Sequence, residues 1–383
     1  MRRVSRFLAL ILIFCLLPCS GQAADLKTGG KSALLMDVST GTILHESNAH
    51  EPLAPASVTK VMTMLLIMES IDSGKISWND MVTTSEAAAA KGGSQVYLKV
   101  GESMSVTDML KSIAVSSAND CACAMAEHIA GSESAFVELM NSRAKELGMN
   151  DTHFVNCTGL DDAENAQNHR TSAHDIAVMS RQLLKNHPEI KKFTTIWMDS
   201  VRDGAFGLSN TNKLIRFYDG ATGLKTGFTS GAGYCLSASA LRDGMELIAV
   251  VMGAESSQIR FQSCKAMLDH GFANYSLIVP DLCDTGEVPI ILGKSSSVRP
   301  KMEQSDAVLI DKAQRSSITT ETALVESLPA PVAQGQRIGT MTIKSGNQIL
   351  KEIPLVAAEA VDRLRFREIY AGVLRQAAMA KPA

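Results

Sequence analysis

The sequence predicts an α+β protein with more than one domain, and three features lead to this prediction. Two short strand patterns near the N-terminus are followed by several helical patterns, and alternating strand patterns return after Gly220. A further stretch rich in valine, isoleucine and threonine then follows. The chain has 383 residues, which is more than one core usually organises. We therefore expect a mixed domain, a small all-β domain and a C-terminal helix.

The first 23 residues are typical of a secretory signal peptide. Three arginines precede an apolar run over residues 7–17, and small residues follow it. The run is too short to span a bilayer as a helix. Acylation of Cys19 is the less favoured alternative, because Pro18 stands where lipoproteins usually have a small residue. The sequence therefore predicts export, with residues 1–23 removed.

The first domain is predicted over residues 24–276. Residues 31–48 are expected to form a hairpin around Ser39-Thr40-Gly41, and an apolar helix begins near Ser57. After Gly220, alternating strands with an Asp243-Gly244 hairpin turn precede a helix over residues 258–268. Between these strand regions, helical spacing predicts helices over residues 106–130, over residues 135–149 with an end at Gly148, and over residues 171–186 with Thr171 or Ser172 as cap.

Residues 277–356 are expected to form an all-β domain, and residues 357–383 carry a helical pattern up to residue 380. This last segment is expected either to dock on the protein or to lie in a membrane interface. We favour the second alternative, a peripheral association with the membrane. An apolar stripe and several basic residues carry that expectation: Phe366, Ile369, Tyr370, Val373 and Ala377, with Arg363, Arg365, Arg367 and Arg375.

Charge and residue usage exclude several classes of protein. Removing residues 1–23 takes away three arginines and no acidic residue, so the formal charge changes from −3 to −6. A mildly acidic chain without a basic cluster is a poor candidate for nucleic-acid binding. The eight histidines form no His-Glu-x-x-His pattern. We expect no metal, no cofactor and no nucleic-acid partner.

Six cysteines remain after cleavage, and export would permit disulfides. Cys121 and Cys123 lie two apart on a helical pattern, so their side chains point in different directions and cannot easily pair. The even number fixes no bridge. Free thiols that pack as small apolar groups are the favoured interpretation for the set: Cys121, Cys123, Cys157, Cys235, Cys264 and Cys283.

Ser57 and Lys60 are the leading candidates for chemistry. Residues three apart on a helix share a face, so the two side chains can meet. Lys60 precedes the apolar run over residues 61–68, and burial there would lower the pKa of its ammonium towards working pH. A neutral lysine beside a serine can remove the hydroxyl proton and create a nucleophile.

Ser-x-x-Lys alone is weak evidence, because Ser142 and Lys145 repeat it within an ordinary amphipathic helix. The first copy is accompanied by Ser117-Ala118-Asn119 before a helix and by Lys225-Thr226-Gly227 where strands begin. Competing copies, Ser345-Gly346-Asn347 and Lys27-Thr28-Gly29, lie in a hairpin turn and on a terminal tail.

The order Ser57, Ser117, Lys225 matches the motifs of penicillin-binding proteins and serine β-lactamases. The segments "MDVSTGTILHESNAHEPLAPASVTKVMT", "SSANDCACAMAEHIAG", "DTHFVNCTGLDD" and "DGATGLKTGFTSGAGYCLSASA" resemble the serine D-alanyl-D-alanine carboxypeptidases, the low-molecular-mass penicillin-binding proteins. The resemblance covers residues 33–271, and "APVAQGQRIGTMTI" with "IPLVAAEAV" resembles their C-terminal β domain.

The resemblance implies a fold, a substrate and a place of action. The fold would be a β-lactamase/transpeptidase-like domain, with an antiparallel sheet flanked by helices and a helical subdomain. The enzyme would remove the terminal D-alanine from peptidoglycan stem peptides in the cell envelope, at the outer face of the cytoplasmic membrane or in the periplasm. It would also be acylated by β-lactam antibiotics.

The resemblance also implies roles for individual residues. Ser57 would attack the carbonyl between the last two D-alanines, and Lys60 would accept its proton. Ser117 would relay a proton to the leaving D-alanine, and Asn119 would hold Lys60 and the substrate amide.

The remaining residues would bind the substrate. Lys225, Thr226 and Gly227 would lie along the substrate's carboxylate end, and Arg260 would assist there. The backbone N–H groups of Ser57 and Phe228 would form the oxyanion hole. The chain departs from the family pattern at Ala118, where glycine is also common, and in a C-terminal helix without tryptophan or a lysine cluster.

Two other functions share some of these features. A class A β-lactamase needs Glu-x-x-Asn for fast deacylation, and Glu164-Asn165-Ala166-Gln167-Asn168 misses that spacing. A non-catalytic penicillin-sensing or wall-binding protein would not need every catalytic residue type to be intact. We therefore rank both below the carboxypeptidase.

Overall fold

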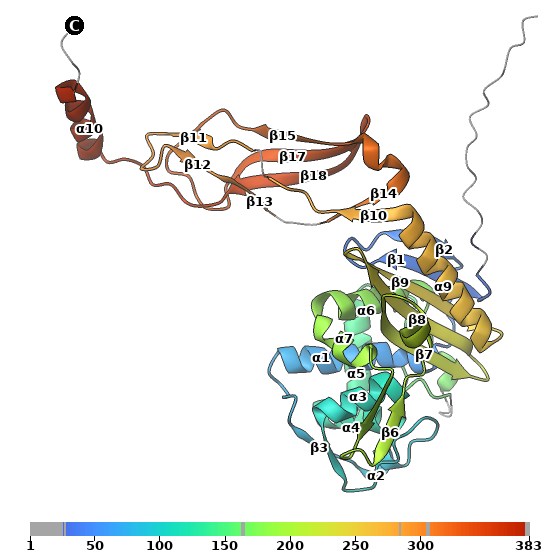
Figure 1. Cartoon of the computed structure of the whole chain (residues 1–383). Helices are drawn as coiled ribbons and strands as arrows, with labels where there is room; N and C mark the ends of the chain where they lie inside the picture. Colours follow the sequence, from blue (N-terminus) through green and yellow to red (C-terminus); the bar gives the residue numbers. More distant parts are fainter. Residues whose placement is uncertain (1–25, 27, 162–164, 283–284, 304–306, 380–383) are drawn as a thin grey trace, which may run out of the picture.

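The computed structural model describes residues 26, 28–161, 165–282, 285–303 and 307–379. A mixed helix-and-sheet domain is followed by an elongated β region and a terminal helix (Figure 1). The predicted α+β class is therefore confirmed. The predicted signal peptide lies outside the described residues.

A five-stranded antiparallel sheet forms the centre of the first domain, in the order β2-β1-β9-β8-β7. Helices cover both faces (Figure 1), so nearly every residue of the central strands β1 and β9 is buried. Alternate residues enter two cores: Leu34 and Val250 face the helical subdomain, whereas Leu35 and Val251 face α9 (Ser257–Asn274). The strands are β1 (Ser32–Asp37), β2 (Ile43–Ser47), β7 (Ala221–Thr229), β8 (Gly233–Arg242) and β9 (Met245–Ala254).

The helical subdomain surrounds α1 (Lys60–Asp72), which is apolar almost all round. Ten of its 13 residues are buried, as expected for a helix in the interior. The other helices are η1 (Ala56–Thr59), α2 (Glu86–Ala89), α3 (Val106–Ser116), α4 (Asn119–Ala130), α5 (Glu133–Glu146), η2 (Ala166–Asn168), α6 (Ala173–Asn186), η3 (Pro188–Ile190), α7 (Lys191–Thr194) and α8 (Leu214–Phe217). Two strand pairs at its edge are β3 (Met81–Thr83) with β4 (Ser103–Ser105) and β5 (Met198–Val201) with β6 (Phe206–Ser209).

Several helix boundaries differ from the sequence expectations, and helix α5 covers Glu133–Glu146 instead of residues 135–149. The pattern over residues 106–130 forms two helices, because Ser117 adopts a left-handed conformation with φ 64° and ends α3. Helix α9 continues to Asn274 instead of ending at residue 268. Ser172 is the cap of α6, since its side chain accepts a hydrogen bond from the Asp175 amide.

The β region begins at Tyr275. Its largest sheet has the order β13-β18-β17-β15, and its apolar residues form two small cores, one around Ile338 and one around Met341 and Leu355. Its elements are β10 (Tyr275–Ile278), β11 (Val288–Ile291), β12 (Ser297–Val298), β13 (Pro300–Met302), β14 (Val308–Asp311), η4 (Lys312–Ser317), β15 (Ile318–Leu324), β16 (Leu328–Pro329), β17 (Arg337–Ser345) and β18 (Gln348–Ala357).

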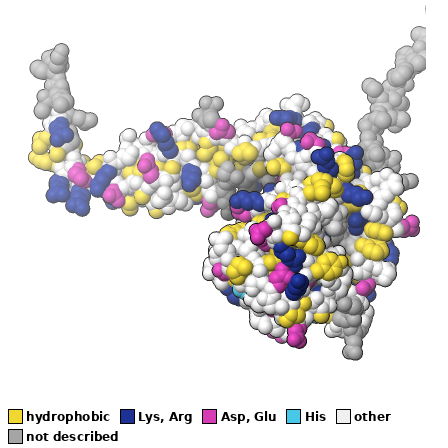
Figure 2. Space-filling view, turned by 60° about the horizontal axis from the view of Figure 1, so that its bottom comes forward, with side chains coloured by type: hydrophobic (Ala, Val, Ile, Leu, Met, Phe, Trp, Pro, Cys, Tyr) yellow, Lys and Arg dark blue, Asp and Glu magenta, His cyan; other side chains and the backbone are white. Residues whose placement is uncertain are grey.

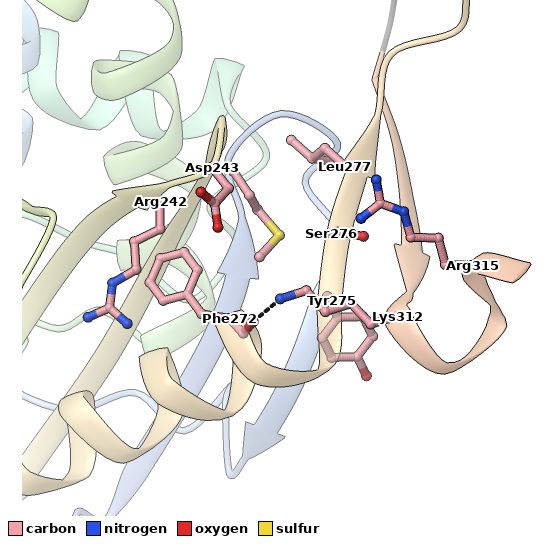
Figure 3. Close-up of a pocket in the computed structure, with 9 residues that line it drawn as sticks. Arg242, Asp243, Phe272, Tyr275, Ser276, Leu277, Lys312 and Arg315 are labelled. Carbon is pink, nitrogen blue, oxygen red and sulfur yellow. Dashed lines mark hydrogen bonds between the residues drawn. The ribbon is translucent and has the colours of Figure 1, made fainter.

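The two regions meet beside the turn between β8 and β9. The Lys312 ammonium donates a 2.6 Å hydrogen bond to the Phe272 carbonyl at the end of α9 (Figure 3). A cavity of about 410 Å³ opens at this junction, lined by Arg242, Asp243, Met245, Phe272, Tyr275, Ser276, Leu277, Lys312 and Arg315.

The terminal helix α10 (Phe366–Met379) begins later than the predicted residue 357. The intervening residues belong to the β region instead, because Val361 is buried in its core and pairs with Val332. None of the helices in the described ranges is long and apolar enough to cross a membrane. The five cysteines within those ranges are buried free thiols: Cys121, Cys123, Cys157, Cys235 and Cys264.

Candidate active site

Ser57 and Lys60 meet at the start of the central helix. Ser57 lies in η1, which leads directly into α1, and Lys60 is the first residue of α1. The Lys60 ammonium nitrogen, Nζ, donates a 2.9 Å hydrogen bond to Ser57 Oγ and a 2.8 Å bond to the carbonyl oxygen of Thr158. The structure thus brings the first two predicted residues together.

Lys60 is completely buried, with 0% of its surface exposed. Burial lowers the pKa of its side chain to about 7, against the opposing effects of Cys157 and Asp120. A substantial fraction of Lys60 is therefore neutral near pH 7 and can accept a proton from Ser57.

Ser117 and Asn119 lie where α3 gives way to α4. The left-handed turn at Ser117 redirects the chain, and both residues are buried. Asn119 Nδ2 donates a 2.7 Å hydrogen bond to the Gly92 carbonyl. Ser117 Oγ and Asn119 Oδ1 are buried without a hydrogen-bond partner among the described residues. Unpaired buried polar atoms are costly, so a site that receives a polar ligand accounts for them.

Lys225 and Thr226 lie on β7, the edge strand of the sheet. Lys225 is 1% exposed, and its Nζ donates a 2.9 Å hydrogen bond to the Thr226 carbonyl. Burial, followed by the nearby charges of Lys60 and Arg260, lowers the pKa of Lys225 well below its ordinary value. Thr226 Oγ1 donates a 2.7 Å hydrogen bond to Thr211 Oγ1.

Gly227 lets β7 pass directly beside Ser57. A Cβ at this position would lie 2.6 Å from the Pro55 carbonyl oxygen and 3.1 Å from the Ser57 amide nitrogen. Backbone atoms cannot move aside as a flexible side chain can, so glycine is needed for this approach. The Lys-Thr-Gly strand therefore passes close to the main chain at Ser57.

Phe228 lies near the C-terminal end of β7, and Arg260 of α9 lies beside this strand. Phe228 is 54% exposed and packs on Tyr234 with a ring separation of 4.3 Å. The Arg260 guanidinium donates to the Gly227 carbonyl at 2.9 Å and lies over the Tyr234 ring. Its Nε has no hydrogen-bond partner among the described residues. The structure thus places Arg260 against the main chain of β7.

The segment "DTHFVNCTGLDD" carried part of the family resemblance, but sequence reasoning assigned no role to the Thr158 carbonyl that it supplies. Asn156 Oδ1 accepts hydrogen bonds from the amides of Thr158 and Gly159, at 3.1 and 2.7 Å. A Cβ on Gly159, which has φ 84°, would lie 1.8 Å from the Ala56 carbonyl oxygen. The signal was an asparagine followed two residues later by Thr-Gly, which is typical of a side-chain-stabilised turn.

Asp120 was also missed. Its buried carboxylate accepts hydrogen bonds from the amides of Val96 and Leu98, at 3.1 and 3.0 Å. The backbone N–H of Asn119 donates a 2.7 Å hydrogen bond to the Ser94 carbonyl. The segment before β4 is therefore fixed to the start of α4, where Asn119 lies.

Comparisons with known proteins agree with this geometry. The family described as D-alanyl-D-alanine carboxypeptidase (peptidase S11) matches residues 20–256, and the penicillin-binding protein 5 C-terminal domain matches residues 282–363. The D-alanyl-D-alanine carboxypeptidase DacF of Bacillus subtilis is 42% identical over 351 residues, covering 90% of this chain and 89% of the relative.

Solved structures give the same result. Penicillin-binding protein 5 from Haemophilus influenzae aligns with a TM-score of 0.75 at 31% identity, covering 88% of this chain and 98% of the other. Penicillin-binding protein D2 from Listeria monocytogenes, solved in an ampicillin-bound form, has a TM-score of 0.59 at 31% identity, covering 65% of this chain and 99% of the other. The chain belongs to the peptidase S11 family of D-alanyl-D-alanine carboxypeptidases.

Proposed function

We propose that the chain removes the terminal D-alanine from peptidoglycan stem peptides through an acyl-enzyme on Ser57. The 2.9 Å hydrogen bond between the fully buried Lys60 and Ser57 carries this proposal. Neutral Lys60 takes the Ser57 proton as Oγ attacks the carbonyl carbon between the last two D-alanines. The backbone N–H groups of Ser57 and Phe228 stabilise the oxyanion that forms.

Collapse of this intermediate breaks the bond to the terminal D-alanine. The leaving nitrogen gains a proton through Ser117, whose hydroxyl otherwise lacks a partner among the described residues. Asn119 Oδ1, buried in the same way, accepts from the substrate amide or from Lys60. Water then hydrolyses the ester on Ser57 and releases the shortened peptide.

The carboxylate of the terminal D-alanine binds at Lys225 and Thr226. Lys225 is buried and its Nζ donates a hydrogen bond to the Thr226 carbonyl. An arriving carboxylate would favour its charged form. Arg260 contributes a nearby positive charge and holds the Gly227 carbonyl. β-Lactams enter by the same route, because Ser57 opens their ring and becomes acylated. A β-lactamase would differ by rapid hydrolysis of that ester.

The test combines turnover with the position of the label. A synthetic pentapeptide ending in D-Ala-D-Ala should release D-alanine, and penicillin should form a stable adduct. Mass spectrometry should locate that adduct on the peptide containing Ser57. An adduct on any other serine would overturn the assignment, and rapid loss of the adduct would favour a β-lactamase.

Export and membrane association extend the proposal. Residues 1–23 would direct the chain to the cell envelope and be removed. Helix α10 would then associate with the membrane surface, since Figure 2 shows apolar and basic side chains together on this end of the molecule. Phe366 is 83% exposed, and Tyr370 and Val373 are each 59% exposed.

Truncation after Val356 should leave peptidase activity unchanged and reduce sedimentation with anionic liposomes, more so at low salt. Equal sedimentation would remove the anchor.

A further inference from the structure

Two loops from different parts of the chain contact residues of the site. Residues 91–98 contact Asn119 and Asp120, and residues 154–160 present the Thr158 carbonyl to Lys60. Both loops meet a single carboxylate outside the catalytic set, that of Glu133. This residue begins α5, whose cap is Ser132.

Glu133 bonds to both loops at once. Its Oε2 accepts a 2.6 Å hydrogen bond from Lys91 Nζ, and its Oε1 accepts from the Cys157 amide at 3.3 Å and from the Cys157 thiol at 3.2 Å. The side chains of Lys91 and Glu133 are only 24% and 22% exposed. Ion pairs withdrawn from water in this way are less screened than surface pairs.

We infer that Glu133, held by Lys91, is a positioning residue that keeps the Thr158 carbonyl on Lys60. The inference rests on the proposed role of Lys60 as the base. It adds a requirement that lies outside the catalytic motifs: the Lys91–Glu133 salt bridge, which joins residues 91–98 to the start of α5, must be intact for Lys60 to be fully effective.

Cys157 connects Glu133 to the carbonyl that Lys60 contacts, because it directly precedes Thr158 in the chain. The Cys157 amide is held by Glu133, and the Cys157 carbonyl accepts a 2.6 Å hydrogen bond from Thr63 Oγ1. With both polar groups of Cys157 fixed, the following peptide has little freedom, and its carbonyl oxygen is the one that Lys60 contacts. Loss of Glu133 would release one of these two restraints.

The charge state of Glu133 suits this task. Burial alone would raise the pKa of this carboxyl, but the hydrogen bond and charge of Lys91, together with the hydrogen bonds from Cys157, outweigh burial and bring the pKa below its ordinary value. Glu133 is therefore ionised at neutral pH and accepts hydrogen bonds on both oxygens.

Loosening this connection has a defined effect on Lys60. The Thr158 carbonyl accepts a hydrogen bond from the ammonium, so it stabilises the protonated form. Moving the carbonyl away should lower the pKa of Lys60 further and leave its amine less well oriented towards Ser57. The other ionisable groups that interact with Lys60 are Cys157, Asp120, Lys225 and His169. Cys157 is itself held by Glu133 and would be affected by its loss.

The first experiment measures acylation by a fluorescent penicillin from about pH 5 to about pH 9 in full-length protein. Glu133→Gln should lower the maximal rate about tenfold, a loss typical of small misplacements near a reacting group. It should also shift the midpoint of the rise with pH to a lower value. Glu138→Gln, the same change at an exposed position of the same helix, should change neither quantity.

A double-mutant cycle separates positioning from general stability. Lys91→Met should reproduce the effect of Glu133→Gln, the double variant should be little worse than either, and Lys91→Arg should restore the wild-type midpoint. If Glu133→Gln does not fold, the two Lys91 variants decide the question. A wild-type midpoint in Lys91→Met, or fully additive losses, would overturn the inference. Failure of Lys60 as the base is a separate result, because Lys60→Arg would then retain acylation close to the wild-type rate.

Discussion

The chain contains two Ser-x-x-Lys segments, and their surroundings are what separates them. Ser57–Lys60 and Ser142–Lys145 have the same spacing, and helices carry both. Lys60 is completely buried and bonded to Ser57, whereas Ser142 and Lys145 are exposed on α5. The same four-residue pattern therefore occupies two opposite environments.

The difference follows from which face each helix buries. Helix α1 is enclosed on all sides, so a lysine at its start loses its hydration. Helix α5 buries Phe136, Met140 and Ala144 and leaves the face of Ser142 and Lys145 to solvent. The motif specifies a distance between two groups, whereas burial and the contacts with β7 and Thr158 distinguish the pair that we propose to be reactive.

The largest expected difference between the two segments is at serine. Ser57→Ala should abolish D-alanine release and penicillin labelling, because the nucleophile is lost. Ser142→Ala should retain both activities in full. Both variants can be compared by release from a pentapeptide and by gel fluorescence. Labelling that persists in Ser57→Ala would remove the distinction between the two segments.

The lysines should differ almost as strongly. Lys60→Arg keeps a positive charge but cannot lose its proton in a protein. It should therefore reduce acylation by roughly 10²–10⁴-fold, the usual contribution of a general base. Lys145→Arg provides the matched control and should be indistinguishable from wild type. Activity of Lys60→Arg within about tenfold of wild type would limit Lys60 to an electrostatic role.

Sequence patterns predicted the elements well where one residue type decides the local conformation. The Asp243-Gly244 turn has φ values of 49° and 77°, which suit a tight hairpin with few alternatives. The predicted start of the terminal helix, at residue 357, was wrong because the residues that follow have an amphipathic pattern. In the structure Val361 is buried in the core of the β region instead. Such tertiary contacts override local pattern.

The site could be predicted only in part for the same reason. Ser57, Ser117 and Lys225 are separated in the sequence, and their order identified them through a family resemblance. The segment around Thr158 carried part of that resemblance, but neither the role of its carbonyl nor the carboxylate of Glu133 could be found in this way. A backbone carbonyl has no sequence signature, and the contact of Glu133 with Cys157 joins positions 24 residues apart.

A change at Gly227 should make the first segment behave more like the second. In Gly227→Ala the added Cβ would approach the Pro55 carbonyl and the Ser57 amide at 2.6 and 3.1 Å, so β7 must move away from η1. We expect acylation to fall by about 10–100-fold with Ser57 and Lys60 intact. Gly207→Ala on β6, where a Cβ meets nothing within 4 Å, is the control. Equal rates for the two variants would show that contact with β7 is unimportant.

The smallest expected effect is on the free energy of unfolding. Lys60 should make this free energy depend on pH, whereas Lys145 should not. Burial lowers the pKa of folded Lys60 to about 7 from 10.5, so between these values the unfolded chain binds more protons than the folded one. The free energy of unfolding contributed by Lys60 should therefore rise with pH in this window, by up to about 1.4 kcal/mol per pH unit. It should reach its full value above the unfolded pKa, decline as pH falls towards about 7, and be lost below the folded pKa.

Denaturant titrations of wild type, Lys60→Met and Lys145→Met from about pH 7 to about pH 9.5 would measure this dependence. The difference between wild type and Lys60→Met should change steadily in favour of wild type as pH rises. The difference for Lys145→Met should stay constant, because exposure leaves that lysine hydrated in both states. A constant difference for Lys60→Met as well would mean that folding does not change the proton affinity of Lys60. The contrast between the two segments would then depend on orientation towards Ser57 and not on burial of the charge.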